Sequence, residues 1–206
     1  MPPRSYVSPA RSAAAAETRE RVIEAAARTL REGESIARFS LDTVAKAAGV
    51  TRLTVYNQFG SRRGLLEAVF DEIAHHGGLH QLADAMAMAD PRAALDRMVE
   101  IFCAFWSCDS AVARLHDAMA TDPEFAEALR ERNERRRRGV TALVDRIAGR
   151  HASAQVRQDA VDLIFALTSY PTFASLSAGR SRDEVCRVVQ TACRAALANL
   201  SDPSSL

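Results

Sequence analysis

Apolar residues recur at intervals of three and four along most of the chain, the spacing of helices that pack through one face. The expected helices are a first one ending near Glu32, 41–48, 51–59, 61–76, a short one before Asp90, one starting at Pro91, one through 112–119, 124–148, 154–177 and 182–199. Glycine and proline fall mostly between these segments, where they end helices. The pattern therefore predicts an all-α fold.

Pro171 lies inside the predicted helix 154–177. A proline ring cannot donate a backbone hydrogen bond, and it collides with the carbonyl four residues earlier. We therefore expect this helix to kink or break near Leu167.

Residues 40–61 have the features of two short helices joined by a tight turn. Ser40 and Thr51 are placed to cap the helices 41–48 and 51–59, because a hydroxyl oxygen can accept a backbone N–H of the first turn. Gly49 lies where the first helix must end in a left-handed backbone conformation. This arrangement is typical of a helix-turn-helix, whose second helix enters the DNA major groove.

The second helix carries polar side chains suited to DNA. Thr51, Arg52 and Thr54 lie at its N-terminal end, which reaches base edges in this motif, and a guanidinium can bind guanine through two hydrogen bonds. Tyr56 and Gln58 are expected to donate to phosphate. The candidate DNA-binding residues are Ser40, Thr51, Arg52, Thr54, Tyr56, Gln58 and Arg62.

The segment Val50-Thr-Arg-Leu-Thr-Val-Tyr-Asn-Gln-Phe-Gly-Ser-Arg-Arg-Gly-Leu-Leu66 resembles the DNA-reading segment of the tetracycline-repressor (TetR) family of bacterial transcriptional regulators. The resemblance is specific over about residues 18–70 and implies an all-helical homodimer. It also implies palindromic double-stranded operator DNA as the partner, released when a small molecule binds the C-terminal domain. Gln58 stands where the family usually has histidine or tyrosine, and Arg62 where it usually has lysine.

With this resemblance, four regions are expected. These are a disordered arm (1–14), a three-helix helix-turn-helix DNA-binding domain (15–60), a connecting helix (61–77) and a larger helical effector-binding and dimerisation domain (78–206). The connecting helix is the expected lever between the two domains.

Composition and charge agree with a DNA-binding role. The chain is 48% hydrophobic and 26% charged, as expected of a soluble globular protein. Its net charge of +1 is the sum of +5 over residues 1–63 and −4 over the remainder, so the basic excess lies in the expected DNA-binding part. No run of eighteen apolar residues is present and the N-terminus lacks an apolar signal core, so we expect a cytoplasmic protein with no membrane partner.

Aromatic and sulfur-containing side chains of the C-terminal part predict a pocket for a small apolar or amphipathic effector. Its candidate lining residues are Met98, Phe102, Phe105, Trp106, His116, Met119, Phe165, Tyr170 and Phe173. Each of these residues is also compatible with an ordinary core position.

The last two helices carry wide apolar stripes with small residues that permit close helix approach. Two such hairpins, one from each subunit, could form a four-helix interface. The candidate interface residues are Val161, Ile164, Val185, Val189, Ala192 and Ala196. Burial within one subunit is the alternative interpretation.

Other chemistry has weaker support. No nucleophile elbow or phosphate-binding glycine loop appears, so neither an enzyme nor a cofactor is expected. The four cysteines lack metal-ligand spacing and are interpreted as small buried hydrophobes, with a thiol-sensing or helical protein-interaction regulator as the alternative. The cluster of His75, His76 and His80 is interpreted as a solvated helix end, and the run Arg135–Arg138 as a solvated face.

Overall fold

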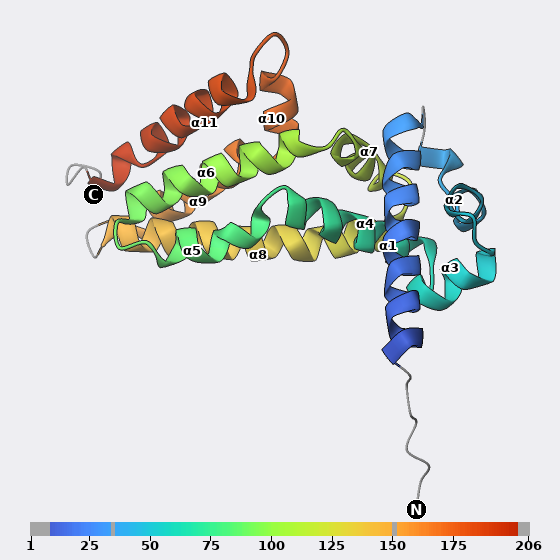
Figure 1. Cartoon of the computed structure of the whole chain (residues 1–206). Coiled ribbons are helices and arrows are strands. Elements are labelled where there is room, and N and C mark those ends of the chain that lie inside the picture. The colour runs from blue at the N-terminus through green and yellow to red at the C-terminus, as the bar shows by residue number, and fades with distance from the viewer. Residues whose placement is uncertain (1–8, 34–35, 150–151, 202–206) are drawn as a thin grey trace, which may run out of the picture. The chain divides into compact units, whose positions relative to one another are not determined.

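The computed structural model describes residues 9–33, 36–149 and 152–201, and within these ranges the chain forms helices and no strand (Figure 1). The elements are α1 (Pro9–Glu32), η1 (Ile36–Arg38), α2 (Leu41–Ala48), α3 (Arg52–Phe59), α4 (Arg62–His76), η2 (Leu79–Gln81), α5 (Leu82–Ala87), α6 (Pro91–Cys108), α7 (Ala111–Ala118), α8 (Pro123–Ala148), α9 (Ala154–Leu167), α10 (Tyr170–Leu176), α11 (Arg182–Ala196) and η3 (Ala198–Ser201). The all-α prediction is confirmed.

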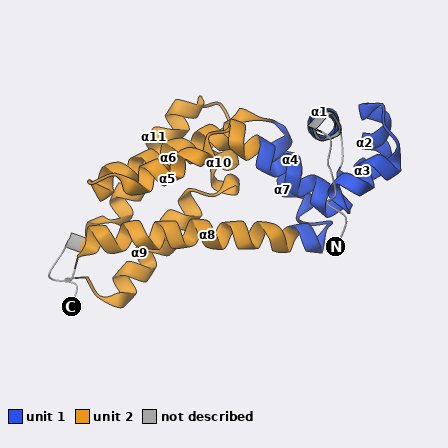
Figure 2. Cartoon of the chain, turned by 60° about the horizontal axis from the view of Figure 1, so that its bottom comes forward, with its two compact units in different colours: residues 1–72, 110–125 blue, residues 73–109, 126–206 orange. Residues whose placement is uncertain are grey.

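The chain divides into two compact units, coloured separately in Figure 2. Unit 1 comprises Met1–Glu72 and Ser110–Phe125, and unit 2 comprises Ile73–Asp109 and Ala126–Leu206. Both α4 and α8 contribute residues to each unit. None of the described helices is long and apolar enough to cross a membrane.

Unit 1 is built on α1, which packs against α2 and α7, while α2 packs against α3. Its core consists of fully buried aliphatic side chains from each of these helices and from α4. They include Val22, Leu30, Val44, Val55, Leu65, Leu66 and Leu115.

Two expectations about unit 1 were wrong. The arm was expected to extend to residue 14, but α1 begins at Pro9, where the alanine-rich stretch 13–16 favours a helix. The remainder of that predicted arm, 1–8, lies outside the described residues. Residues 110–125 were placed in the C-terminal domain, but they belong to unit 1, because α7 buries Ala111, Val112 and Leu115 and packs against α1 and η1.

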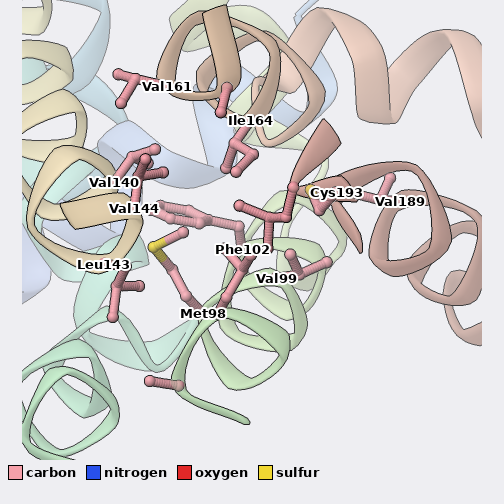
Figure 3. Close-up of a cluster of buried hydrophobic side chains, with 14 of the residues drawn as sticks. Met98, Val99, Phe102, Val140, Leu143, Val144, Val161, Ile164, Val189 and Cys193 are labelled. Atoms are coloured by element: carbon pink, nitrogen blue, oxygen red, sulfur yellow. The ribbon is translucent and has the colours of Figure 1, made fainter. Parts of the chain in front are cut away.

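Unit 2 contains a core shared by α6, α8, α9, α10 and α11, part of which is shown in Figure 3. Helix α6 packs against α5, α10 and α11, and α11 also packs against α9. Asp90 caps α6 by accepting the Arg92 N–H at 2.8 Å, and Pro91 occupies its first turn.

The break expected near Leu167 is confirmed. Helix α9 ends at Leu167, and α10 begins at Tyr170 with Pro171 in its first turn. Ser169 caps α10 by accepting the Thr172 N–H at 3.4 Å. The break leaves backbone carbonyl groups at the end of α9 that bind side chains from other helices, as described below.

Candidate DNA interface and small-molecule site

The joint between α2 and α3 has the predicted capping geometry. The Ser40 hydroxyl accepts the Thr43 N–H at 3.1 Å, and Gly49 has a φ of 66°. The N–H of Val50 then donates to the Ala45 carbonyl at 3.0 Å, which closes the end of α2. A side chain at Gly49 would be strained by its positive φ, so glycine fixes this turn.

Helix α3 is anchored in the core of unit 1 by Val55 and is capped at its N-terminal end by Thr51. Val55 is fully buried, and the Thr51 oxygen accepts the Thr54 N–H at 3.1 Å. The hydroxyl groups of Thr51 and Thr54 also form a hydrogen bond of 2.8 Å. These contacts orient the N-terminal end of α3 and engage both threonine hydroxyls locally.

The outer face of α3 presents Arg52, Leu53 and Tyr56 to solvent. The Arg52 side chain is 68% exposed, and its Nε lies 3.5 Å from a carboxylate oxygen of the equally exposed Asp42. An exposed pair at this distance is weak, so Arg52 can exchange it for another acceptor. Tyr56 is 56% exposed, which leaves its hydroxyl available for a phosphate oxygen.

Leu53 is a candidate contact that was not among the predicted residues. Its side chain is 65% exposed, more than that of Tyr56. The helical period places Leu53 about 200° from the buried Val55, which is the sequence signal for an outward position. An exposed apolar side chain beside Arg52 is suited to contact a thymine methyl group.

Gln58 is directed toward α1. Its amide nitrogen donates to the Ala15 carbonyl at 3.4 Å, and Arg19 donates to the Gln58 carbonyl at 3.5 Å. Gln58 thus joins α3 to α1, and its predicted phosphate contact stays a prediction.

Arg62 also contacts other residues of its own unit. Its guanidinium donates to the Asp122 carboxylate at 2.6 Å, to the Phe39 carbonyl at 3.0 Å and to the Ile36 carbonyl at 3.4 Å. Asp122 in turn caps α8 by accepting the Phe125 N–H at 3.0 Å. Arg62 thus donates to groups inside unit 1, and its predicted phosphate contact stays a prediction.

The start of α4 lies unusually close to the end of α3. Ser61 caps α4 by accepting the Gly64 N–H at 3.0 Å. A Cβ atom at Gly64 would lie 2.1 Å from the Phe59 carbonyl oxygen, so only glycine fits there. This close contact restricts the angle between α3 and α4.

The predicted effector residues are divided between the units. His116 and Met119 belong to unit 1, whereas the other seven belong to unit 2. Of those seven, Met98, Phe102, Phe105 and Phe173 are buried core residues. The partly exposed residues are Trp106, Phe165 and Tyr170. Core packing explains the first group, since these positions form the regular inner stripes of their helices.

Aromatic rings of α6 and α10 form a connected cluster in unit 2. The Trp106 ring centre lies 6.2 Å from that of Phe102 and 5.6 Å from that of Tyr170. The Trp106 indole N–H donates to the Thr168 carbonyl at 3.1 Å, at the break after α9. Apolar rings with a few polar groups are typical of small-molecule sites.

A cation lies against this cluster. Arg136 was interpreted as part of a solvated face, but its Nη1 donates to the Phe165 carbonyl at 2.9 Å and to the Thr168 hydroxyl at 2.8 Å. Its Cζ lies 4.0 Å from the Phe165 ring centre and 5.7 Å from that of Phe102. The interpretation of the arginine run as one solvated face is therefore wrong for Arg136.

Phe165 also lines a hollow of about 650 Å³ in unit 2. Its other lining residues are all on α8, namely Glu127, Arg130, Glu131, Asn133, Glu134, Arg135 and Arg138. The ring of Phe165 thus contacts Arg136 and borders a solvent-accessible hollow.

The predicted dimer residues lie inside the subunit. Val161, Ile164, Val185 and Val189 are all buried in the core of unit 2, and Ala192 and Ala196 are partly buried. The assignment of the four buried residues to an interface between subunits was wrong, because α9 and α11 pack those faces against α6 and α8. The large apolar side chains that these two helices expose are Leu163, at 53%, and Val188, at 42%.

The thiols of Cys103 on α6 and Cys186 on α11 are neighbours. The Cys186 thiol and burial raise the pKa of Cys103, whereas the Cys103 thiol lowers the pKa of Cys186. Burial raises the pKa of Cys193 to about 12. Among the described residues, no group of three or more His, Cys, Asp or Glu side chains could hold a metal ion.

The chain thus combines a helix-turn-helix unit with a larger helical unit, and known proteins share this arrangement. Residues 22–69 match the model of a family described as bacterial regulatory proteins, tetR family. The chain is 34% identical over 114 residues to the HTH-type transcriptional regulator EthR of Mycolicibacterium smegmatis, covering 54% of this chain and 52% of EthR. It is 27% identical over 127 residues to the HTH-type transcriptional regulator TtgR of Pseudomonas putida, covering 61% and 60%.

Solved structures agree in fold. NalD, the secondary repressor of the MexAB-OprM multidrug efflux pump in Pseudomonas aeruginosa, superposes with a TM-score of 0.66 at 21% identity, covering 89% of this chain and 97% of NalD. The TetR-like regulator LfrR of Mycobacterium smegmatis, in complex with proflavine, superposes with a TM-score of 0.53 at 22% identity, covering 89% and 97%. The helix-turn-helix part of the chain is thus similar to that of the tetR family of bacterial regulatory proteins. The chain spans about half the length of EthR and 60% of TtgR, and these relatives are named as regulators and not as enzymes.

Proposed function

We propose that this chain is a homodimeric transcriptional regulator that binds palindromic operator DNA through unit 1. A small molecule bound in unit 2 would release the protein from the operator. The observation that carries the proposal is the exposed face of α3, where Arg52, Leu53 and Tyr56 project from a helix-turn-helix fixed by caps on both helices. The names of EthR, TtgR and NalD as regulators support it.

Binding selection from a random duplex library tests DNA recognition. A dimer with two reading helices should enrich two inverted half-sites whose centres are roughly one helical turn, or a multiple of it, apart. The affinity for the enriched duplex should fall steeply with added salt, because Lys and Arg contacts to phosphate release counterions. Enrichment of no sequence, or of single half-sites, would contradict the proposal.

The dimer interface is proposed on the outer face of α9 and α11, around Leu163 and Val188. These helices pack side by side, so the two exposed side chains can belong to one apolar surface. Exposed alanines on the same helices, Ala166 and Ala195, permit close approach of a second copy.

Two neighbouring substitutions separate this interface from the core. Val188→Asp should produce a folded monomer, because the carboxylate opposes association and is solvated in the free subunit. Val189→Asp should instead unfold unit 2, because an unpaired carboxylate at a side chain only 2% exposed costs several kcal/mol. Sedimentation velocity and circular dichroism distinguish the two results. A Val188→Asp protein that stays dimeric would place the interface elsewhere.

Release by a small molecule requires that ligand binding in unit 2 be coupled to DNA binding by unit 1. Helix α4 contributes residues to both units, so tilting it could change the separation of the two reading helices in a dimer. A typical coupling of about 1–3 kcal/mol would weaken DNA binding roughly 5- to 150-fold, and DNA must weaken ligand binding by the same factor.

A thiol-sensing regulator is the second candidate function, because the Cys103 and Cys186 thiols contact each other. Peroxide would take two electrons and two protons from the pair, leaving one disulfide and two waters. Peroxide treatment of the wild type and of Cys186→Ser, followed by mass spectrometry and DNA titration, tests this function. Loss of DNA binding in both proteins would exclude the pair as the sensor.

A further inference from the structure

Arg136 is a cation that forms no ion pair with any carboxylate in the described part of the chain. Both of its described hydrogen bonds are made by Nη1, to a backbone carbonyl and to the hydroxyl of Thr168. No carboxylate of the described chain pairs with it, although Arg137, the next residue, pairs with Asp162. Burying a charge without a counter-charge is costly, so this arrangement requires an explanation.

Capping of α9 explains only part of why Arg136 is buried. The carbonyl of Phe165 lies at the C-terminal end of α9, where a cation is favourable, and the break before α10 frees that carbonyl from a continuing helix. This role occupies Nη1 alone. The Nε atom of Arg136 is buried and has no hydrogen-bond partner among the described residues.

The unpaired Nε indicates which chemical group would fit beside Arg136. In a guanidinium group, Nε–H and one N–H of Nη2 point in parallel from the same edge, which matches the two oxygens of a carboxylate. The faces of the Arg136 group lie against Phe102 and Phe165, so an acceptor would approach in the plane of the group, along this edge.

Arg136 is charged under ordinary conditions. Burial, and secondarily the positive charge of Arg137, lower the pKa of Arg136 to about 10. It therefore remains protonated at neutral pH, and its destabilising effect on the fold is relieved only when the pH rises above about 10. A bound anion would relieve it at neutral pH.

We propose that Arg136 binds the carboxylate of the effector, and that the effector is an apolar carboxylic acid whose body lies among Phe102, Trp106, Phe165 and Tyr170. Trp106, Phe165 and Tyr170 are partly exposed, and Phe165 borders the hollow along α8, so rotation of its ring would open a route to Nε. This inference rests on the proposed function, since it names the chemical class of the releasing ligand.

Paired acids and amides test the charge directly. The probes are 1-naphthoate with 1-naphthamide and octanoate with octanamide, titrated by calorimetry and by the fluorescence of Trp106, the single tryptophan. At least one acid should bind about 10- to 100-fold more tightly than its amide, because a hydrogen-bonded charge pair is worth that factor over a neutral pair. Equal affinities, or no acid binding at roughly 1 mM, the weak end of specific binding, would overturn the proposal.

Substitutions test the residue. Arg136→Gln should remove the preference for the acid, and Arg136→Lys, which keeps the charge but not the parallel donors, should reduce it partly. Arg187→Gln is the control, because it removes an exposed arginine of unit 2 that does not line the hollow. A preference that survives in Arg136→Gln, or one lost equally in Arg187→Gln, would contradict the assignment. If Arg136→Gln does not fold, Arg136→Lys with the same four probes decides the question.

Measuring DNA affinity in the presence of each probe distinguishes this inference from the proposed function. If naphthoate binds through Arg136 but leaves DNA affinity unchanged, the acid site stands and release by a small molecule fails. If a neutral probe releases DNA equally from the wild type and from Arg136→Gln, release stands and the acid site fails.

Discussion

Two arginines in this chain occupy similar surroundings, but their positive charges are balanced differently. Arg62 in unit 1 lies near the face of Phe39, donates to two backbone carbonyls and pairs with the Asp122 carboxylate. Arg136 in unit 2 lies against Phe165 and donates to a carbonyl and a hydroxyl, and no carboxylate of the described residues pairs with it. An arginine that the chain itself neutralises is structural, whereas one left without an anion is suited to bind one.

Of the two arginines, Arg62, which pairs with a carboxylate, is expected to contribute more to stability. Asp122→Asn would leave Arg62 without its carboxylate and should lower the free energy of unfolding by about 1.5–3 kcal/mol, since hydrogen bonds to charged groups contribute that much. Urea denaturation measures it. The matched control is Asp42→Asn at the exposed Arg52 pair, with an expected change below about 1 kcal/mol. Equal changes in the two variants would mean that the Arg62 pair contributes no more than a surface pair.

Replacement of the unpaired Arg136 should change the free energy of unfolding much less. Arg136→Met removes a buried charge and keeps an apolar side chain against Phe102 and Phe165. The free energy of unfolding should stay within about 1 kcal/mol of the wild type, because a lost uncompensated charge offsets two lost hydrogen bonds. The same urea experiment measures it. A loss of more than about 3 kcal/mol would show that Arg136 is as structural as Arg62.

DNA titrations extend the comparison to Arg62. Because its donors are used internally, Arg62→Ala should lower stability without changing the salt dependence of DNA binding at a temperature where the variant is folded. A phosphate contact would instead reduce the salt slope by about one. Fluorescence anisotropy at several salt concentrations distinguishes the two results.

The smallest effect is expected at the surface of unit 2. Ser181 donates its backbone N–H and its hydroxyl to Glu184, each at 2.7 Å, and these bonds lower the pKa of Glu184 below its ordinary value of 4.5. The stabilisation is present above pH 4.5 and is lost as the pH falls through the lowered pKa. Glu184→Gln should therefore flatten the acid side of the stability profile measured by circular dichroism. An unchanged profile would show that the cap does not affect folding.

Local patterns predicted the helix-turn-helix well. Ser40, Gly49 and Thr51 act through neighbours within a few residues, so their spacing is sufficient to place both helices. The break after Leu167 was equally predictable from the sequence, because the effect of Pro171 is local.

Contacts between distant segments were not predictable in the same way. Gln58 and Arg62 are redirected by Ala15 and Asp122, which lie 43 and 60 residues away. The stripes on α9 and α11 predicted buried faces correctly, but a stripe does not distinguish a core inside one subunit from an interface between two. Arg136 was interpreted from its exposed neighbours, although its own position on the helix directs it toward α9.

The central claim is that unit 1 reads DNA through the exposed end of α3. Its most direct test is the affinity of the wild type and of Arg52→Ala for the selected duplex and for duplexes with one base pair changed. The wild type should discriminate against a change at one position by about 1–3 kcal/mol, and Arg52→Ala should lose that discrimination while keeping it elsewhere. Discrimination that is unchanged at every position in Arg52→Ala would contradict the claim.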